Sequence, residues 1–359
     1  MRVFHVISGF ENGGVEALLW RMIAVMPQDI EWHIVAHAVP VPACRARFEA
    51  LGVQVHLVPC RKRYLAHKRA LKALFLRYRP DAVHVHTTEW GAPSLSVAKA
   101  VGVPMRIQHS HAARREHNPF LRVLYRMLLI HARKNATHCV ACGRAAALYA
   151  FGKAAVAKGR VTVLPNGIDT AAFAFSAERR RGARAALGLP PDAVAVGMVA
   201  RFSHQKNHKA ALRIFAAYHK IEPRAVLLLV GDGPLRAATE RRARRLLPPD
   251  AVRFLGVRED VAALYAAMDT FLLPSRFEGL PITLVEAQTA GLACVVSDCI
   301  DGEVNFSGSV RFLPVKDTAA FVAALCAPAP AREGAEHAAH EKGFSLAAAV
   351  AAWRALYGI

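Results

Sequence analysis

TFLLPSRFEGLPITLVEAQTAGLACVVSD, residues 270–298, shows the repeating unit of the fold most clearly. A short apolar run, TFLLP, is followed by a polar loop, by a helical stretch and by a second apolar run, ACVVSD. Pro281 suits the first position of the helix, and Gly291 suits its end. Because parallel strands need a helical crossover between them, this stretch predicts one unit of a parallel α/β sheet.

The same alternation extends over the whole chain. Seven short apolar runs alternate with amphipathic segments before residue 166, and six more follow after about residue 190. Parallel sheets covered on both faces have this pattern, so we expect an α/β chain of two doubly wound, Rossmann-like lobes. The expected domains are 1–168, 169–342 and a last helix within 343–359. An Ala/Pro-rich stretch at 327–342 is expected to be a loose linker.

The charge of the chain narrows the possible partners. The net charge is +20, and residues 1–168 alone hold 24 Lys and Arg against 8 Asp and Glu. The segments 61–79 and 114–134 are basic and amphipathic, which is typical of helices at an anionic membrane surface. The alternatives are helices with a solvated basic face, or a general bias towards arginine. We do not expect nucleic acid as a partner, because no recognised module accompanies the charge.

Cysteine content and hydropathy indicate the cellular compartment in which the protein is expected. Seven cysteines without regular spacing favour a reducing compartment, and no uncharged apolar run of eighteen residues is present. We therefore expect a cytoplasmic protein that attaches peripherally to the inner face of a membrane.

Two acids, Glu278 and Glu286, flank the start of the helix in the opening stretch. Glu278 is expected in the loop and Glu286 about a turn and a half inside the helix, with the free amides of Gly279 and Leu280 between them. Such a helix start favours phosphate, so the geometry suits a diphosphate, a sugar and a ribose. The alternative is a helix-start acid and an unrelated surface acid.

Cations and glycines at other strand ends fit the same chemistry. Arg201 and Lys206 follow a strand and could hold a diphosphate leaving group, although each alone could be a surface charge. The segments LVGDGP (229–234) and FLGVRED (254–260) place glycine where a backbone approaches a ligand at the carboxyl edge of a sheet. Ordinary turns are the alternative.

Several motifs, taken in this order and spacing, resemble the retaining GT-B glycosyltransferases of family 4. They are VLPNGID (163–169), RFSHQKNH (201–208), VGDGP (230–234), FLGVRED (254–260) and FEGLPITLVEAQTAGLACVVSD (277–298). Within that family, RIQHSHAARRE (106–116) and the segment 286–304 are similar to bacterial capsule and exopolysaccharide enzymes. The resemblance implies a GT-B fold whose lobes face a central cleft, with an acceptor-binding first lobe, a nucleotide-sugar-binding second lobe and a last helix that crosses back to the first.

The resemblance also implies roles for individual residues. Arg201, Lys206 and the backbone amides of Gly279, Leu280 and Pro281 would hold the donor diphosphate. Glu286 would bind the ribose, Glu278 the transferred sugar, and the backbone around Phe254, Gly256 and Val257 would frame the base. Gly13 and Gly14 match the family's glycine loop, and His109 matches the histidine beside the donor sugar. The implied catalytic set is His109, Glu278, Arg201 and Lys206.

The expected reaction transfers a hexose or N-acetylhexosamine with retention of configuration. We expect the donor to be a nucleotide sugar, UDP-linked, and the acceptor to be a lipid-linked saccharide. The expected setting is capsule, exopolysaccharide or lipopolysaccharide synthesis. Retention is drawn for this family as front-face substitution, in which the departing phosphate takes the acceptor proton. No Asp-x-Asp occurs in the sequence, so neither a divalent metal nor another cofactor is expected. Oligomeric state is left open.

Other functions stay open at this point. A non-catalytic sugar-nucleotide-binding partner of a polysaccharide assembly complex would keep the cations without transferring a sugar. An NDP-sugar epimerase of the same fold would need no acceptor. The pairs His84 with His86 and His109 with His111 alternate on strands and could bind zinc, although no acidic ligand is evident nearby.

Overall fold

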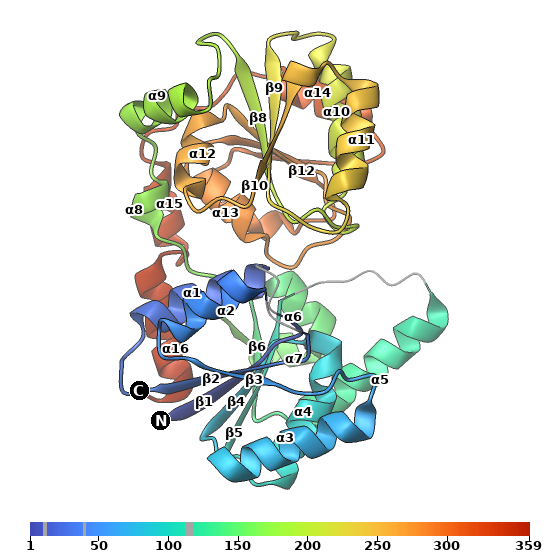
Figure 1. The fold of residues 1–359 in the computed structure, drawn as a ribbon, viewed down its shortest axis with the longest axis vertical. Helices are drawn as coiled ribbons and strands as arrows, with labels where there is room; N and C mark the ends of the chain where they lie inside the picture. The colour runs from blue at the N-terminus through green and yellow to red at the C-terminus, as the bar shows by residue number, and fades with distance from the viewer. Residues whose placement is uncertain (10–12, 39–40, 112–117) are drawn as a thin grey trace. The chain divides into compact units, whose positions relative to one another are not determined.

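The computed structural model describes residues 1–9, 13–38, 41–111 and 118–359. The chain divides into two units, each with its own parallel sheet (Figure 1). The first unit contains Met1–Asn166 and Ala349–Ile359, and the second contains Gly167–Ala348. The last eleven residues therefore belong to the same unit as the first strand.

A parallel sheet forms the centre of the first unit. Over the described residues its strand order is β3-β2-β1-β4-β5-β6-β7. The strands are β1 Arg2–Val6, β2 Glu31–Ala36, β3 Gln54–Leu57, β4 Ala82–Val85, β5 Met105–Ser110, β6 His138–Ala141 and β7 Thr162–Val163. The winding reverses between β1 and β4, and ligands of open parallel sheets bind at the carboxyl ends of strands beside such a reversal.

Helices cover both faces of this sheet (Figure 1). Along β1, Phe4 and Val6 join the core that α3 and α4 cover, whereas His5 faces the other side, 5.7 Å from Trp353 of α16 between ring centroids. The helices are α1 Gly14–Val25, α2 Pro42–Glu49, α3 Tyr64–Tyr78, η1 Thr88–Gly91, α4 Ala92–Ala100, α5 Pro119–Asn135, α6 Arg144–Phe151, α7 Lys153–Ala157 and α16 Leu346–Tyr357. The far C-terminal residues thus complete one face of the first sheet.

The second unit repeats the architecture with the strand order β10-β9-β8-β11-β12-β13. The strands are β8 Val194–Val199, β9 Ala225–Val230, β10 Val252–Gly256, β11 Thr270–Leu273, β12 Ala293–Ser297 and β13 Val310–Leu313. Every residue of β9 and β11 is buried, as expected of central strands covered on both faces. Here the winding reverses between β8 and β11. The loops after these two strands therefore lie where open parallel sheets bind ligands.

The helices of the second unit lie in two layers. α10 packs against α11 and α14 on one face, and α13 packs against α12, α8 and α15 on the other (Figure 1). Their bounds are α8 Thr170–Phe173, α9 Ala177–Ala186, α10 His208–His219, α11 Arg236–Leu246, η2 Pro249–Ala251, α12 Val261–Ala267, α13 Ile282–Thr289, η3 Gly302–Val304, α14 Thr318–Leu325 and α15 Ala335–Glu341. The predicted fold class, two doubly wound parallel α/β sheets, is confirmed.

Two local predictions were wrong. Pro281 is the cap residue ahead of α13 and not its first residue, although Gly291 does end the helix with a left-handed φ of 69°.

Residues 327–342 are not a loose linker, because they contain α15 and the anchoring residue Arg332. The Arg332 guanidinium donates hydrogen bonds to the carbonyl oxygens of Tyr265, Met268 and Ala290, at 2.9–3.0 Å. Burial, followed by nearby Arg180, lowers the pKa of Arg332 to about 10.

Candidate functional site

Two loops of the second unit, one after β8 and one after β11, are fastened together. The backbone N–H of Arg276 donates to the carbonyl of Gln205 at 2.8 Å, and the side-chain amide of Gln205 donates to the carbonyl of Phe277 at 3.1 Å. Asn207, in the left-handed region with a φ of 57°, donates from its side chain to the carbonyl of Pro274 at 3.0 Å. These bonds fix the loop that carries Lys206 against the loop that carries Glu278.

Lys206 and Glu278 form an ion pair at this junction, in which Glu278 is buried and Lys206 half-buried. The Lys206 Nζ lies 2.6 Å from Glu278 Oε1, and the Gln205 amide donates to Glu278 Oε2 at 3.1 Å. Only 5% of the Glu278 side chain is exposed. Desolvating a carboxylate is costly unless it is paired, so the pairing itself holds the cation in place.

Glu286 lies on α13 and is also buried, with 3% of the residue exposed. The Tyr265 hydroxyl, from α12, lies 3.1 Å from Glu286 Oε2 and 3.0 Å from the Thr283 carbonyl. The alternative that Glu286 is a surface acid is therefore wrong. Sequence reasoning missed Tyr265, since one tyrosine 21 residues before Glu286 in an unrelated segment carries no motif.

The backbone predicted to cradle a diphosphate lies at the start of α13. Gly279 is buried and Leu280 half-buried, directly before the helix. Pro281, predicted as a third amide, cannot donate because proline has no N–H. The remaining donors are those of Gly279, Leu280 and the first turn of α13.

The glycines at the end of β9 allow two loops of the protein to approach each other closely. Gly231 has a φ of 126°, and a Cβ there would lie 2.4 Å from the carbonyl oxygen of Ala200. Gly233 has a φ of 153°, and its Cβ would lie 2.7 Å from the Phe202 carbonyl oxygen. Both glycines let the loop after β9 pass closely over the loop after β8, so they shape the surroundings of Arg201 before any ligand is considered.

Residues predicted to frame the base lie at the end of β10. Phe254 is half-buried and its ring centroid lies 6.0 Å from that of Phe202. Gly256 adopts a left-handed φ of 69°, and Val257 is 58% exposed. Arg201 is exposed on the neighbouring loop. The second unit thus brings the predicted donor residues to the carboxyl edge of one sheet.

The remaining predicted residues belong to the first unit. Gly13 caps α1 and Gly14 is its first residue, while Glu11 and Asn12 of the predicted loop lie outside the described residues. A Cβ on Gly13 would lie 2.7 Å from Glu16 Oε2, whereas Gly14 has open space around it. His109 lies on β5 with no exposed surface.

His109 ends a chain of hydrogen bonds that begins on the C-terminal helix. The Tyr357 hydroxyl lies 2.7 Å from His84 Nδ1, and His84 Nε2 lies 3.1 Å from His109 Nδ1. His109 Nε2 is buried without a partner among the described residues. Burial is the main cause that holds the pKa of both histidines well below the usual value, so the two rings are neutral.

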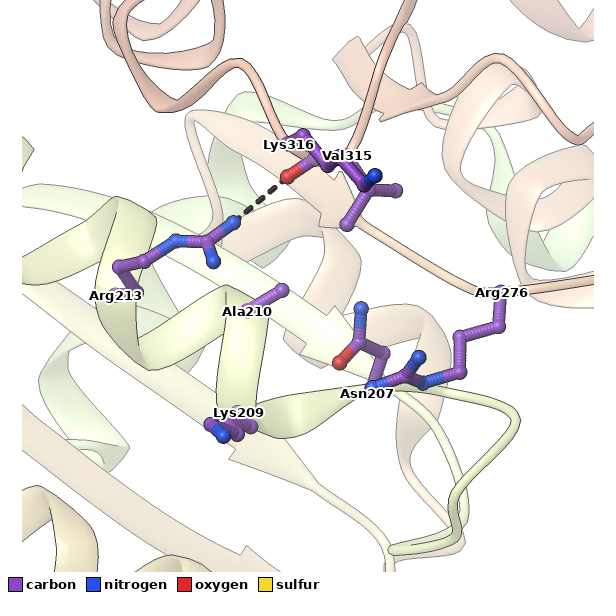
Figure 2. A pocket seen from close by; sticks show the side chains of 7 residues that line it. All are labelled: Asn207, Lys209, Ala210, Arg213, Arg276, Val315 and Lys316. Atoms are coloured by element: carbon purple, nitrogen blue, oxygen red, sulfur yellow. Dashed lines mark hydrogen bonds between the residues drawn. The ribbon is translucent and has the colours of Figure 1, made fainter.

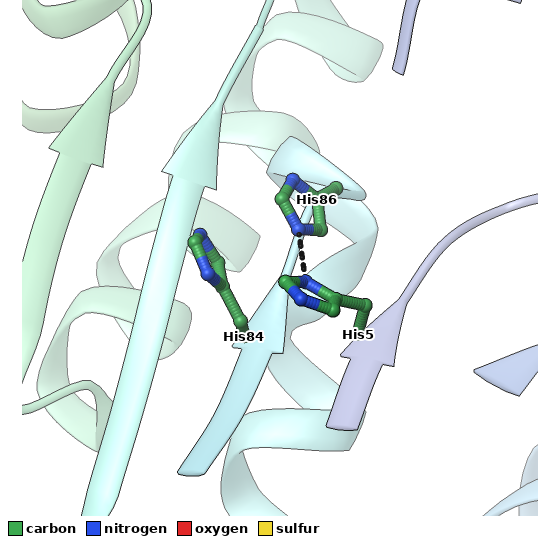
Figure 3. Close-up of side chains that lie close together, drawn as sticks. All are labelled: His5, His84 and His86. Carbon is green, nitrogen blue, oxygen red and sulfur yellow. Dashed lines mark hydrogen bonds between the residues drawn. The ribbon is translucent and has the colours of Figure 1, made fainter. Parts of the chain in front are cut away.

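Five histidines gather around this chain, at the ends of β1, β4 and β5. Between ring nitrogens, His5 lies 3.0 Å from His86 (Figure 3). His86 lies 2.8 Å from His111, again between ring nitrogens. The ring nitrogens of His5, His84 and His86 are close enough to hold a metal ion. The rings of His84 and His86, however, are stacked at 4.3 Å with planes 21° apart, so their in-plane lone pairs run side by side. This arrangement of His84 and His86 suits a hydrogen-bonded stack better than a zinc site that uses both rings.

None of the helices in the described residues has the length and apolar composition that crossing a membrane requires.

The sequence is similar to two known protein families and to several curated proteins. The family described as "Glycosyltransferase Family 4" matches residues 12–172, and the family "Glycosyl transferases group 1" matches residues 180–307. The Bacillus subtilis protein EpsF, named as a glycosyltransferase, is 33% identical over 85% of this chain and 81% of its own. The Escherichia coli UDP-Gal:alpha-D-GlcNAc-diphosphoundecaprenol alpha-1,3-galactosyltransferase is 28% identical over 69% of this chain and 67% of its own.

Solved structures agree on the fold. The Anabaena protein HepE, in complex with UDP and glucose, superposes with a TM-score of 0.80 over the whole of both chains, at 19% identity. The fold is therefore that of the GT-B glycosyltransferases. From the family matches, the similarity to EpsF and the set of two buried acids with nearby cations, we conclude that this chain is a glycosyltransferase and belongs to glycosyltransferase family 4.

Proposed function

We propose that this enzyme transfers a hexose or N-acetylhexosamine, with retention, from a UDP-sugar to a lipid-linked saccharide in bacterial polysaccharide synthesis. The observation that carries the proposal is the Lys206–Glu278 pair beside the start of α13, with Glu286 four residues inside that helix. The similarity to a galactosyltransferase named for UDP-Gal and a diphosphoundecaprenol acceptor supports the donor and the acceptor class.

In this proposal the second unit stabilises the leaving diphosphate. Arg201, Lys206 and the amides of Gly279 and Leu280 neutralise the negative charge that grows on UDP as the glycosidic bond breaks. Glu286 accepts hydrogen bonds from the ribose, and Glu278 accepts them from the transferred sugar. The departing phosphate oxygen takes the acceptor's proton, so no protein carboxylate attacks the sugar. The cations of this set perform the charge neutralisation that a metal ion would supply, and we propose that the reaction is metal-independent.

His109 is proposed to hold the sugar as a hydrogen-bond donor. When Tyr357 donates to His84 Nδ1, the His84 proton is on Nε2 and is donated to His109 Nδ1, which leaves the His109 proton on Nε2. That nitrogen is the unpartnered one. A neutral imidazole of fixed tautomer can donate to a sugar hydroxyl without acting as a general acid.

Attachment to an anionic membrane is the second part of the proposal, and α5 supports it. Phe120, Val123 and Met127, three or four residues apart on α5, are 84%, 58% and 64% exposed. Arg122 and Arg126 lie on the same helix, on one side of this apolar stripe. An exposed apolar stripe beside cations suits the interface of an anionic bilayer, where a lipid-linked acceptor is presented.

The membrane part is tested by flotation with vesicles. We expect the protein to float with vesicles of phosphatidylglycerol and not with neutral phosphatidylcholine, and the triple change Phe120→Ser, Val123→Ser, Met127→Ser to abolish flotation. Equal flotation on both kinds of vesicle, or no effect of the triple change, argues against this surface.

The reaction is tested by nucleotide release from UDP-, GDP- and ADP-sugars, each with and without bacterial lipid extract and with EDTA present. Release from a UDP-sugar that depends on the extract and survives EDTA supports a metal-independent transferase, and NMR of the product reports retention. Release without any acceptor favours the epimerase or a hydrolase, and UDP binding without turnover favours the non-catalytic partner.

A further inference from the structure

A cavity of about 450 Å³ lies in the second unit between the first half of α10 and the helix α11. Fourteen described residues line it, of which five are Lys or Arg, two are His and none is Asp or Glu. The five cations are Lys209, Arg241, Arg242, Arg245 and Arg276. A smaller cavity of about 190 Å³ shares Asn207, Lys209 and Arg276 with it, and Figure 2 shows the Arg276 side chain running back towards Asn207. The cavity is therefore strongly cationic.

The sequence of α11 separates its charges between two sides of the helix. Its one acid, Glu240, accepts a hydrogen bond from Arg236 at 2.9 Å, and neither residue lines the cavity. Arg241, Arg242 and Arg245 line the cavity. Like charges held close together in one cavity repel one another, so the cluster is most stable when an anion lies between them.

Two buried polar groups at the cavity have no hydrogen-bond partner among the described residues. His208 is 3% exposed, and neither of its ring nitrogens is bonded, although its ring stacks on Phe202 with centroids 4.0 Å apart. The Nε of Arg242 is also buried and unbonded. Buried polar groups in native proteins normally have partners, so orphaned groups at a cavity indicate a bound water or ion.

We propose that this cavity binds the phosphate group of a phosphorylated ligand, at a site separate from the donor diphosphate. Arginine matches phosphate oxygens with paired, charge-assisted hydrogen bonds, and three arginines of one helix face the same space. None of the residues assigned to the donor lines the cavity.

The cavity also contacts the loop that positions Lys206. Ser203, His204 and Asn207 of this loop line the cavity, whereas Gln205 and Lys206 between them bond to Glu278. A phosphate in the cavity therefore contacts the same loop that presents Lys206 to the ion pair.

Pyrophosphate is the probe for this site. Calorimetry of the full chain saturated with UDP is expected to show one further site, because UDP occupies the donor site. The double variant Arg242→Gln, Arg245→Gln should weaken that binding at least about tenfold. Arg244→Gln is the matched control, since Arg244 is exposed on the same helix and does not line the cavity. Equal loss in the control and in the double variant overturns the proposal.

Repeating the test in a variant without the assigned donor cations makes it independent of the proposed function. In the variant Arg201→Gln, Lys206→Gln the assigned donor cations are gone and no UDP is needed. Pyrophosphate binding that survives there, and disappears when Arg242→Gln and Arg245→Gln are added, supports the cavity even if UDP is not the donor. Absence of binding in this variant and in the UDP-saturated chain overturns the proposal. Displacement of pyrophosphate by phosphatidylglycerol vesicles, and not by neutral ones, identifies a lipid headgroup as the ligand, whereas no displacement identifies a free phosphate ester.

Discussion

Glu278 and Glu286 are both buried carboxylates on one loop and helix, but they have different partners. Glu278 bonds a lysine and an amide from the loop after β8, and Glu286 receives the hydroxyl of Tyr265 from α12. Glu278 is therefore tied to the cation that would neutralise a diphosphate, whereas Glu286 lies deeper along the helix, where a ribose would reach it.

Changing each acid to alanine should affect a different property, UDP affinity for Glu286 and turnover for Glu278. Glu286→Ala is expected to weaken UDP binding about tenfold, which corresponds to roughly 1.4 kcal/mol, because the ribose loses its acceptor. Glu278→Ala should lower turnover strongly and leave UDP affinity within about twofold, because Lys206 is released and stays available to the diphosphate. Calorimetry with UDP and nucleotide release measure the two effects. Equal and negligible effects of both changes would show that the site is assigned wrongly.

The hydroxyl of Tyr357 is a positioning group in the proposed mechanism. Tyr357→Phe keeps the ring against Trp353 and removes the bond to His84, so we expect turnover to fall about tenfold while UDP affinity is unchanged. Nitrogen-15 NMR of the histidines should show the tautomer of His109 becoming mixed, which a purely structural role would not cause. Tyr78→Phe, beside His33 and His56, is the control. An unaltered tautomer after Tyr357→Phe would contradict the assignment.

Among the secondary-structure elements, the sequence predicted the strands and crossovers well because short runs rich in apolar residues, such as AVLLLV of β9, alternate with amphipathic segments. It failed at 327–342, where Ala and Pro suggested a linker. Arg332 anchors that segment through main-chain carbonyls of residues 42–67 positions away, and main-chain carbonyls leave no sequence signal. Tyr265 was missed because a single tyrosine, 21 residues from Glu286, carries no motif. The pairing of Lys206 with Glu278 joins residues 72 positions apart, and only the family resemblance brought them together beforehand.

Arg332→Met should therefore destabilise the second unit. The change keeps an apolar stem but removes the donor from the carbonyl oxygens of Tyr265 and Ala290, whereas the carbonyl of Met268 keeps its hydrogen bond from Arg180. We expect the free energy of unfolding to fall by about 3 kcal/mol. Urea unfolding followed by circular dichroism measures it. Arg244→Met, an exposed arginine, should change the midpoint little, and an equally small effect at Arg332 would mean that the segment is loosely held after all.

At the scale of the whole molecule, the first unit carries an acid-sensitive histidine stack. Burial lowers the pKa of His5 to about 3 and that of His111 to about 4, and it is the main cause that holds those of His84, His86 and His109 well below the usual value. Protons therefore bind the unfolded chain near pH 6.5 but not the folded one. Stability is full above about pH 6.5 and falls as the pH drops below it, by about 1.4 kcal/mol per pH unit for each such histidine.

Tryptophan fluorescence can follow this effect in the first unit alone, because Trp20, Trp32, Trp90 and Trp353 all belong to it. The urea midpoint reported by fluorescence should be lower at pH 5.5 than at pH 7.5. A midpoint that is unchanged or higher at pH 5.5 would contradict the neutral state of the stack.

The return of residues 349–359 to the first unit has a consequence for biosynthesis. Trp353 and Tyr357 pack on one face of the sheet that begins at Arg2, so that face lacks part of its cover while the ribosome is still making the second unit. The first unit is begun early but completed last. A nascent chain stalled before residue 349 should accordingly expose its histidine face to chaperones and proteases, even when all of its strands have been synthesised.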